Sequence, residues 1–191
     1  MKARLAAPVA ALLLSGCISF GPKVPDTLLS LTSETPAQAG AGSSGTLASA
    51  IVVLEPEAGQ RLNVQRIPVQ IDAANVAYLE NALWVERPAR LLQRLIAETI
   101  RGRNGRLVLD TDPASDTATR LSGRLIDMGY DARTASAIVR FDAVRERPDG
   151  RIDTRRFESI VPGVQAKAGP VGAALNRAAN ELARQVAEWA V

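Results

Sequence analysis

The chain has 191 residues, of which 47% are hydrophobic and 23% charged, and its formal net charge is +3. This size and composition suit a single domain with a packed core, and the near balance of charges gives no support to nucleic-acid binding. The sequence has no histidine and one cysteine, so the commonest general base, metal ligand and thiol nucleophile are missing. Nucleophile-elbow, zinc-protease and phosphate-loop motifs are also missing. We therefore expect a protein that is not an enzyme and needs no cofactor or metal.

The first residues have the pattern of an export signal. Lys2 and Arg4 precede an apolar run of ten residues, 5–14. A bilayer-spanning helix needs roughly 20 residues, so this run predicts a removable signal and not a membrane anchor. The run ends in Leu14-Ser15-Gly16-Cys17, whose small residues suit cleavage by a signal peptidase.

This ending resembles the bacterial lipobox, in which the cysteine receives a diacylglyceryl group and the chain is cut just before it. The resemblance implies a signal peptide over residues 1–16, cleavage between Gly16 and Cys17, and covalent lipid, such as palmitate, on Cys17. The mature chain would then have 175 residues. The alternative is an ordinary secretory signal with a chance cysteine.

The segments behind the signal are short and interrupted. Residues 17–27 contain glycine and proline and are interpreted as a lipidated tether, and a short strand is expected at 28–31. Residues 32–49 are rich in alanine, glycine and serine, which bury too little surface to become ordered, so we expect a flexible surface loop. Further extended segments are expected at 51–54, 62–71 and 75–80.

An amphipathic helix is expected from Arg87-Pro88, because proline is favoured in the first helical turn. Its apolar face and its polar face follow the helical period, and Gly102 and Gly105 would end it. The apolar face holds Leu91, Leu92, Leu95, Ile96 and Ile100, and the polar face Arg90, Gln93, Arg94 and Glu98.

The second half of the chain predicts a strand at 107–109, a turn at 110–116 and an antiparallel meander. The meander strands, 118–131, 134–147 and 151–161, alternate apolar and polar residues, and Pro148-Asp149-Gly150 is a typical hairpin turn. A second amphipathic helix is expected at 170–191. Its apolar stripe would hold Val171, Leu175, Ala178, Leu182, Val186 and Trp189, and its polar face Asn180, Glu181, Arg184, Gln185 and Glu188.

Both helices need a sheet face on which to bury their stripes. The expected fold class is therefore α/β: one domain over residues 28–191, with a mixed sheet, an antiparallel meander and two main amphipathic helices packed on it.

Four features together resemble the ABC-type transport auxiliary lipoproteins. They are the lipobox, the Leu-rich strand 28–31, the strand 51–54 followed by an extended segment around Pro68, and the Trp-x-Glu-x-Pro entry from Trp84 to Pro88. An amphipathic carboxy-terminal helix closes the family's domain as it does this chain. The first strand lacks the tyrosine that the family usually has.

The resemblance implies an outer-membrane lipoprotein of a Gram-negative envelope, anchored at the periplasmic face. Such proteins work with a mammalian-cell-entry (MCE) domain protein, and often with an inner-membrane ABC transporter or other integral membrane components, in moving lipids or other hydrophobic compounds. An aspartate after the cysteine would resemble the inner-membrane retention signal, and Ile18 stands there instead. A homo-oligomer is left open.

The two tryptophans are candidates for different roles. Trp84 could contact a partner, because aromatic side chains serve as interface anchors, or it could pack under the first helix. Trp189 lies on the apolar stripe of the second helix and is expected in the core. Tyr78 could line a lipid groove, although nothing in the pattern distinguishes it from core residues.

Two charged clusters have simple structural interpretations. Arg101, Arg103 and Arg106 could bind phosphate groups or an acidic partner, but cations also complement the carboxy-terminal end of a helix. The acidic turn 110–116 weakly resembles a site for a hard cation, yet it lacks the glycine and closing glutamate of an EF-hand loop.

Two functions remain after these observations. The first is an accessory that docks a partner at the outer membrane, which requires an exposed docking surface. The second is a stand-alone periplasmic lipid-binding lipoprotein, which requires its own apolar cavity.

Overall fold

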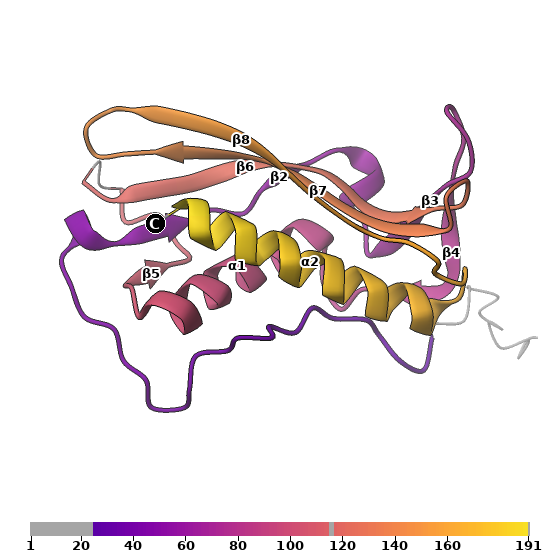
Figure 1. Cartoon of the computed structure of the whole chain (residues 1–191), viewed down its shortest axis with the longest axis horizontal. Coiled ribbons are helices and arrows are strands. Elements are labelled where there is room, and N and C mark those ends of the chain that lie inside the picture. The colour runs from indigo at the N-terminus through magenta and orange to yellow at the C-terminus, as the bar shows by residue number, and fades with distance from the viewer. Residues whose placement is uncertain (1–24, 115–116, 191) are drawn as a thin grey trace, which may run out of the picture.

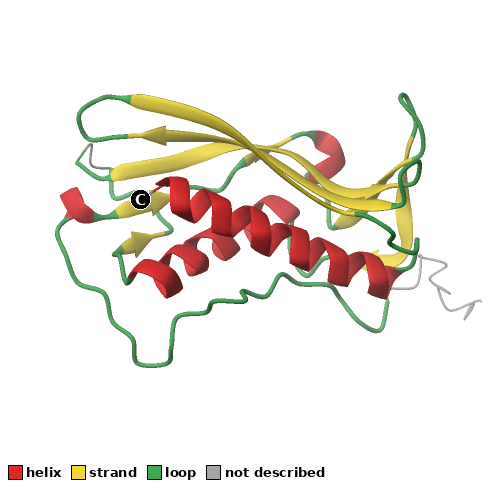
Figure 2. Ribbon diagram, viewed as in Figure 1, coloured by secondary structure: helices red, strands yellow, loops and turns green. Residues whose placement is uncertain are grey.

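A computed structural model describes residues 25–114 and 117–190, and these form two layers. One layer is an eight-stranded mixed sheet and the other is a pair of helices on one of its faces (Figures 1 and 2). The expected α/β fold, with its antiparallel meander and two packed helices, is confirmed. The strands are β1 (Ile51–Val53), β2 (Glu57–Ala58), β3 (Arg66–Gln70), β4 (Val76–Leu83), β5 (Val108–Leu109), β6 (Thr119–Asp131), β7 (Ser136–Glu146) and β8 (Ile152–Val161). The helices are η1 (Leu47–Ser49), η2 (Gln60–Leu62), α1 (Pro88–Asn104) and α2 (Ala168–Ala190).

Strand β6 organises the sheet. One of its edges pairs antiparallel with β7, which pairs antiparallel with β8. Its other edge is shared along its length by β1, β2 and β3, all parallel to it. β5 extends the sheet beyond β1, and β4 extends it beyond β3. The meander is the part that alternation predicts, and the three parallel pairings bring together segments far apart in the chain.

A bend in β6 depends on glycine. The β6–β7 register shifts between Leu125 and Asp127, and Gly123 just before it has φ of 149°. A Cβ on Gly123 would lie 2.1 Å from the carbonyl oxygen of Asp142 on β7. Only a residue without a side chain allows the two strands to approach this closely.

Helix α1 begins and ends where its local sequence directs. Pro88 is in the first turn, and Gly105, with φ of 58°, closes the helix with an N–H bond to the carbonyl of Arg101. Gly102 lies inside the helix and does not end it. In the part of the chain described here, no helix has the length and hydropathy needed to cross a membrane.

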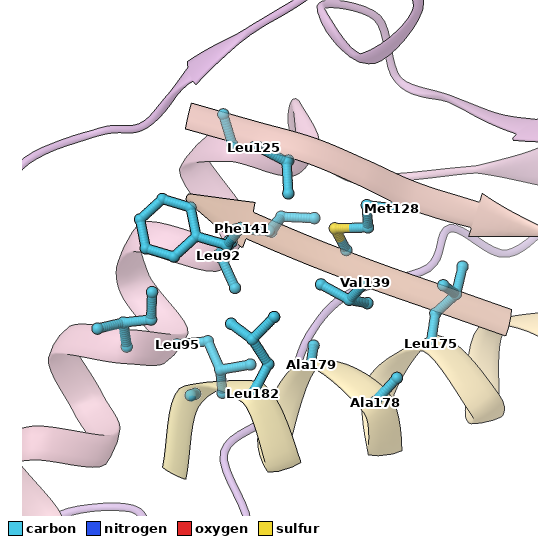
Figure 3. Close-up of a cluster of buried hydrophobic side chains, with 14 of the residues drawn as sticks. Leu92, Leu95, Leu125, Met128, Val139, Phe141, Leu175, Ala178, Ala179 and Leu182 are labelled. Atoms are coloured by element: carbon cyan, nitrogen blue, oxygen red, sulfur yellow. The ribbon is translucent and has the colours of Figure 1, made fainter. Parts of the chain in front are cut away.

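The core lies between the helices and the inner face of the sheet. Side chains of α1, α2, β6 and β7 meet there (Figure 3). The predicted apolar stripes are buried, including Leu92, Leu182 and Ile96. The labelled members are Leu92 and Leu95 of α1, Leu125 and Met128 of β6, Val139 and Phe141 of β7, and Leu175, Ala178, Ala179 and Leu182 of α2.

Two residues assigned to the polar helix faces are in fact buried. Gln93 is 8% exposed, and its Nε2 donates to the carbonyls of Val53 and Asp110 at 2.8 and 3.1 Å. Asn180 is 6% exposed and binds the amino-terminal segment. Both exceptions follow the rule that a buried amide must be hydrogen-bonded. Apart from a bond from Asn180 to the carbonyl of Asn176 on the same helix, their partners lie far away in the chain.

Candidate anchoring and docking surfaces

The described chain starts at the end of the molecule that holds the β3–β4 hairpin and the first turn of α2 (Figure 1). Cys17, Gly16 and most of the predicted tether lie outside the described residues. Leu29 exchanges two backbone bonds with the end of β4: its N–H donates to Leu83 at 2.7 Å, and its carbonyl accepts from Val85 at 2.8 Å. The expected strand 28–31 is therefore a single bridge at Leu29, which fixes the chain to the end of β4.

Residues 29–37, which we call the strap, then cross both helices. Amide and carboxylate side chains of α2 and α1 hold its backbone. The bonds are Thr32 N–H to Asn176 Oδ1 at 2.8 Å, Asn180 Nδ2 to the Thr32 carbonyl at 2.9 Å, Glu34 N–H to Asn180 Oδ1 at 2.9 Å, and Ala37 N–H to Glu98 Oε1 at 2.8 Å.

Residues 32–46 form no helix or strand, in agreement with the expected loop, and only 47–49 differ, since they form η1. The first part of this loop is bound to the helices through the strap. Gly102 allows this contact, because a Cβ there would lie 2.0 Å from the carbonyl oxygen of Thr35. Composition alone missed the strap because its partners are single polar side chains on distant helices.

Trp84 is in the core and is fully buried (0% exposed). Its main-chain N–H donates to the carbonyl of Gln65 at 2.8 Å, and its backbone forms the bridge to Leu29. Of the two roles considered for Trp84, the structure therefore supports packing in the core. The expectation that Trp84 contacts a partner is corrected, because a fully buried ring cannot touch another protein.

Trp189 packs against the core as expected, although part of its surface is accessible. Its ring meets Phe157 of β8 edge to face, with centroids 5.6 Å apart. The guanidinium of Arg145 lies 4.6 Å from the centre of the same ring, and it also donates to the Trp189 carbonyl. Arg145 thus interacts with the last turn of α2, where a cation is favoured.

The arginines at the end of α1 bind other parts of the same domain. Arg101 lies 3.7 Å from Glu98 and 3.8 Å from Asp110, and Arg103 lies 2.9 Å from Glu188 of α2. These contacts support the structural interpretation of the cluster, in which the cations complement the helix end and join it to its neighbours. Nothing in them assembles a phosphate site.

The acidic turn and Tyr78 are also explained by local contacts. Asp112 accepts from the N–H of Ala114 and forms an ion pair with Arg120, and its pKa is lowered chiefly by the Ala114 bond. Asp116 lies outside the described residues. Tyr78 on β4 has the guanidinium of Arg66 4.2 Å from its ring centre, so it is part of the β3–β4 ribbon.

The outer face of the sheet, opposite the helices, carries rows of charge. Arg61 lies 3.4 Å from Asp127, and Arg140 pairs with Glu158 on β8. These rows border an open hollow of about 320 Å³. Its charged lining residues are Arg61, Asp72, Asp127, Asp131, Arg133 and Arg140. Burial raises the pKa of Asp127 despite the nearby Arg61. A hollow lined in this way suits ions and water better than an acyl chain.

The domain, which Leu29 joins at the end of β4, can be compared by sequence with known families. The model of the ABC-type transport auxiliary lipoprotein component matches residues 29–187. The chain belongs to this family. No curated protein matches the chain.

Solved structures share the fold at low sequence identity. A protein of Xanthomonas campestris is 16% identical, with a TM-score of 0.68, over 85% of this chain and 94% of its own. An uncharacterized protein is 11% identical, with a TM-score of 0.67, over 86% of this chain and 100% of its own. These likenesses support the fold assignment. PelC of Paraburkholderia phytofirmans, a dodecamer, reaches a TM-score of only 0.42 at 12% identity over 76% of this chain and 89% of its own, and does not indicate how this chain assembles.

Proposed function

We propose that this lipoprotein is anchored by Cys17 at the periplasmic face of the outer membrane and docks a partner in an MCE/ABC-type system. That system would move lipids or other hydrophobic compounds across the Gram-negative envelope, and the protein's own contribution would not be catalytic. The observation that carries the proposal is the family match, which begins at residue 29, twelve residues after the candidate lipidated cysteine.

The entry of the chain into the domain supports an anchored role. Two or more acyl chains give stable membrane attachment, whereas one chain gives only marginal binding. Leu29 is bonded to the end of β4, and its side chain fills the space left by Gly172 of α2, where a Cβ would lie 2.6 Å from Leu29 Cδ2. A pull on the tether would therefore act on the β4 end of the sheet and on α2, and not on a loose terminus.

The tightly packed interior of the domain favours a docking role over a role as a lipid carrier. The space between the sheet and the helices is occupied by packed side chains such as Trp84, Phe141 and Leu92, each at most 1% exposed. The charged hollow on the outer face offers little to an acyl chain. The alternative, a stand-alone lipid-binding lipoprotein, would need an apolar cavity of several hundred Å³.

The anchor is tested by replacing its sulfur. Cys17→Ser should remove incorporation of labelled palmitate, release the protein from the outer-membrane fraction or leave it uncleaved, and fail to restore transport in a deletion strain. Ser19→Ala, two residues further on, is the matched control and should behave like the wild type. Outer-membrane fractionation of Cys17→Ser at the normal mature size would refute the anchor.

A further inference from the structure

The edge of the sheet at β8 is open. Within the described ranges, β8 pairs with β7 alone, and its ten residues contain no proline and no bulge. An edge of this kind presents unpaired N–H and C=O groups that can pair with another strand. Such edges are usually protected by proline, bulges, short length or charged side chains. Of these, β8 has only charged side chains, namely Asp153, Arg155, Arg156 and Glu158.

The β7–β8 hairpin determines which main-chain groups are free. The N–H of Arg147 donates to the carbonyl of Arg151 at 2.9 Å, so the alternate residues that follow, from Asp153 to Val161, also direct their groups toward β7. The groups that point away from β7 belong to Ile152, Thr154, Arg156, Glu158 and Ile160. All five side chains are exposed.

These five side chains lie on the outer face and continue its rows of charge. In one row, Arg156 binds Asp142 of β7 through two bonds of 2.6 Å, and Asp142 lies opposite Arg124 of β6. In the next row, Glu158 pairs with Arg140, which lies opposite Asp127. Along each row the charges alternate in sign. At the open edge the first row ends on Arg156 and the second row ends on Glu158.

We propose that the open edge of β8 binds the β8 of a second copy of this chain, antiparallel and about a two-fold axis beside Phe157. In this register Arg156 of each copy faces Glu158 of the other, so both rows of alternating charge continue into the second copy. Thr154 and Ile160 face each other at the two ends. The four facing pairs provide about eight main-chain hydrogen bonds.

Charge complementarity favours this pairing register over the register that is shifted by two residues. A shift by two residues, with Ile152 facing Ile160, would place Arg156 opposite Arg156 of the other copy, and like charges directly opposite are destabilising. In the proposed register each guanidinium gains a carboxylate. Arg156 has the room for this, because its side chain is 63% exposed.

The helix layer accommodates a second copy. Helix α2 contacts both β7 and β8, so in the proposed pairing the α2 helices of the two copies lie on the same face of the continued sheet, one on each side of the two-fold axis. A contact between these two helices would bury surface in addition to the surface buried by the strand pairing, as a stable dimer requires.

The test uses full-length lipoprotein extracted in detergent, with two different tags on two copies. Wild-type copies should capture each other. Arg156→Glu alone and Glu158→Arg alone place like charges across the axis twice, so each should lose self-capture by more than about tenfold. Mixed together, these two variants restore both opposite-charge pairs and should capture each other as the wild type does. Arg90→Glu, a reversal of an exposed side chain on α1 that belongs to neither row, should keep self-capture.

Capture between the two mixed variants is the decisive measurement, because only their mixture restores opposite charges across the axis. Thermal melts establish that each variant is folded, and native mass spectrometry should find two copies in the complex. The proposal is overturned if wild-type copies do not associate, if the single variants still self-associate, if the mixture fails to recover, or if the complex holds more than two copies. None of these outcomes bears on Cys17 or on the transport partner, so they leave the proposed function to its own tests.

Discussion

Leu182→Ala tests whether the stripe of α2 is core or an interface. Leu182 is 0% exposed and lies among Leu95, Ala179 and side chains of the sheet (Figure 3). Truncation of a buried leucine leaves a cavity and costs about 3 kcal/mol. In a domain of this size each kcal/mol corresponds to about 2–4 °C, so the melting temperature should fall by about 6–12 °C.

Arg184→Ala is the matched control, two residues away on the same helix. The Arg184 side chain is 42% exposed, and it pairs with Glu181 and Glu188 along the helix. Exposed pairs of this kind contribute little, so the free energy of unfolding should change by less than about 1 kcal/mol. Thermal melts of both variants are the assay. If Leu182→Ala melts like the wild type while partner capture is lost, the stripe is an interface and the packing described here is wrong.

Asn180→Ala removes the bonds that hold the strap, so amide hydrogen exchange in residues 32–34 should accelerate while the rest of the domain keeps its protection. Hydrogen bonds from Arg184 and then Gln185 lower the pKa of Glu181 from 4.5 to about 2. Because this side chain is 44% exposed, solvent screening reduces the linked stability to less than about 1 kcal/mol, which is complete above the unfolded pKa and lost as the pH falls from about 4.5 to 2, so Glu181→Gln should flatten that part of the melting profile slightly. Gly123→Ala should destabilise the domain because its Cβ would meet a β7 carbonyl, whereas Gly169→Ala, with nothing within 4 Å, should not; equal melts for the two would contradict the close approach of β6 and β7.

Local patterns predicted most of the fold. The meander follows from strict alternation and from Pro148-Asp149-Gly150, whose glycine has φ of 79°. Helix α1 follows from its proline start and glycine end, and α2 begins only two residues before the expected Pro170. These features depend on residues close together in the chain, where period and turn chemistry act directly.

The missed features depend on distant partners. Gln93 and Asn180 fit polar helix faces by period, but each is buried by bonds to backbone far away in sequence. The only local signal for Asn180 was the pair of alanines, 178–179, directly before it. The two interpretations of Trp84 could not be separated by pattern, since an aromatic residue before a helix suits both a core and an interface.

The central claim is that this lipoprotein docks a protein partner at the outer membrane. The most direct test is to capture tagged full-length protein from native envelopes after mild crosslinking and to identify by mass spectrometry the proteins and lipids that accompany it. The account predicts an MCE-domain protein, enriched with the wild type and reduced to background when Cys17→Ser removes the anchor. Recovery of lipid in the purified protein with no protein partner would contradict the account and support the lipid-binding alternative.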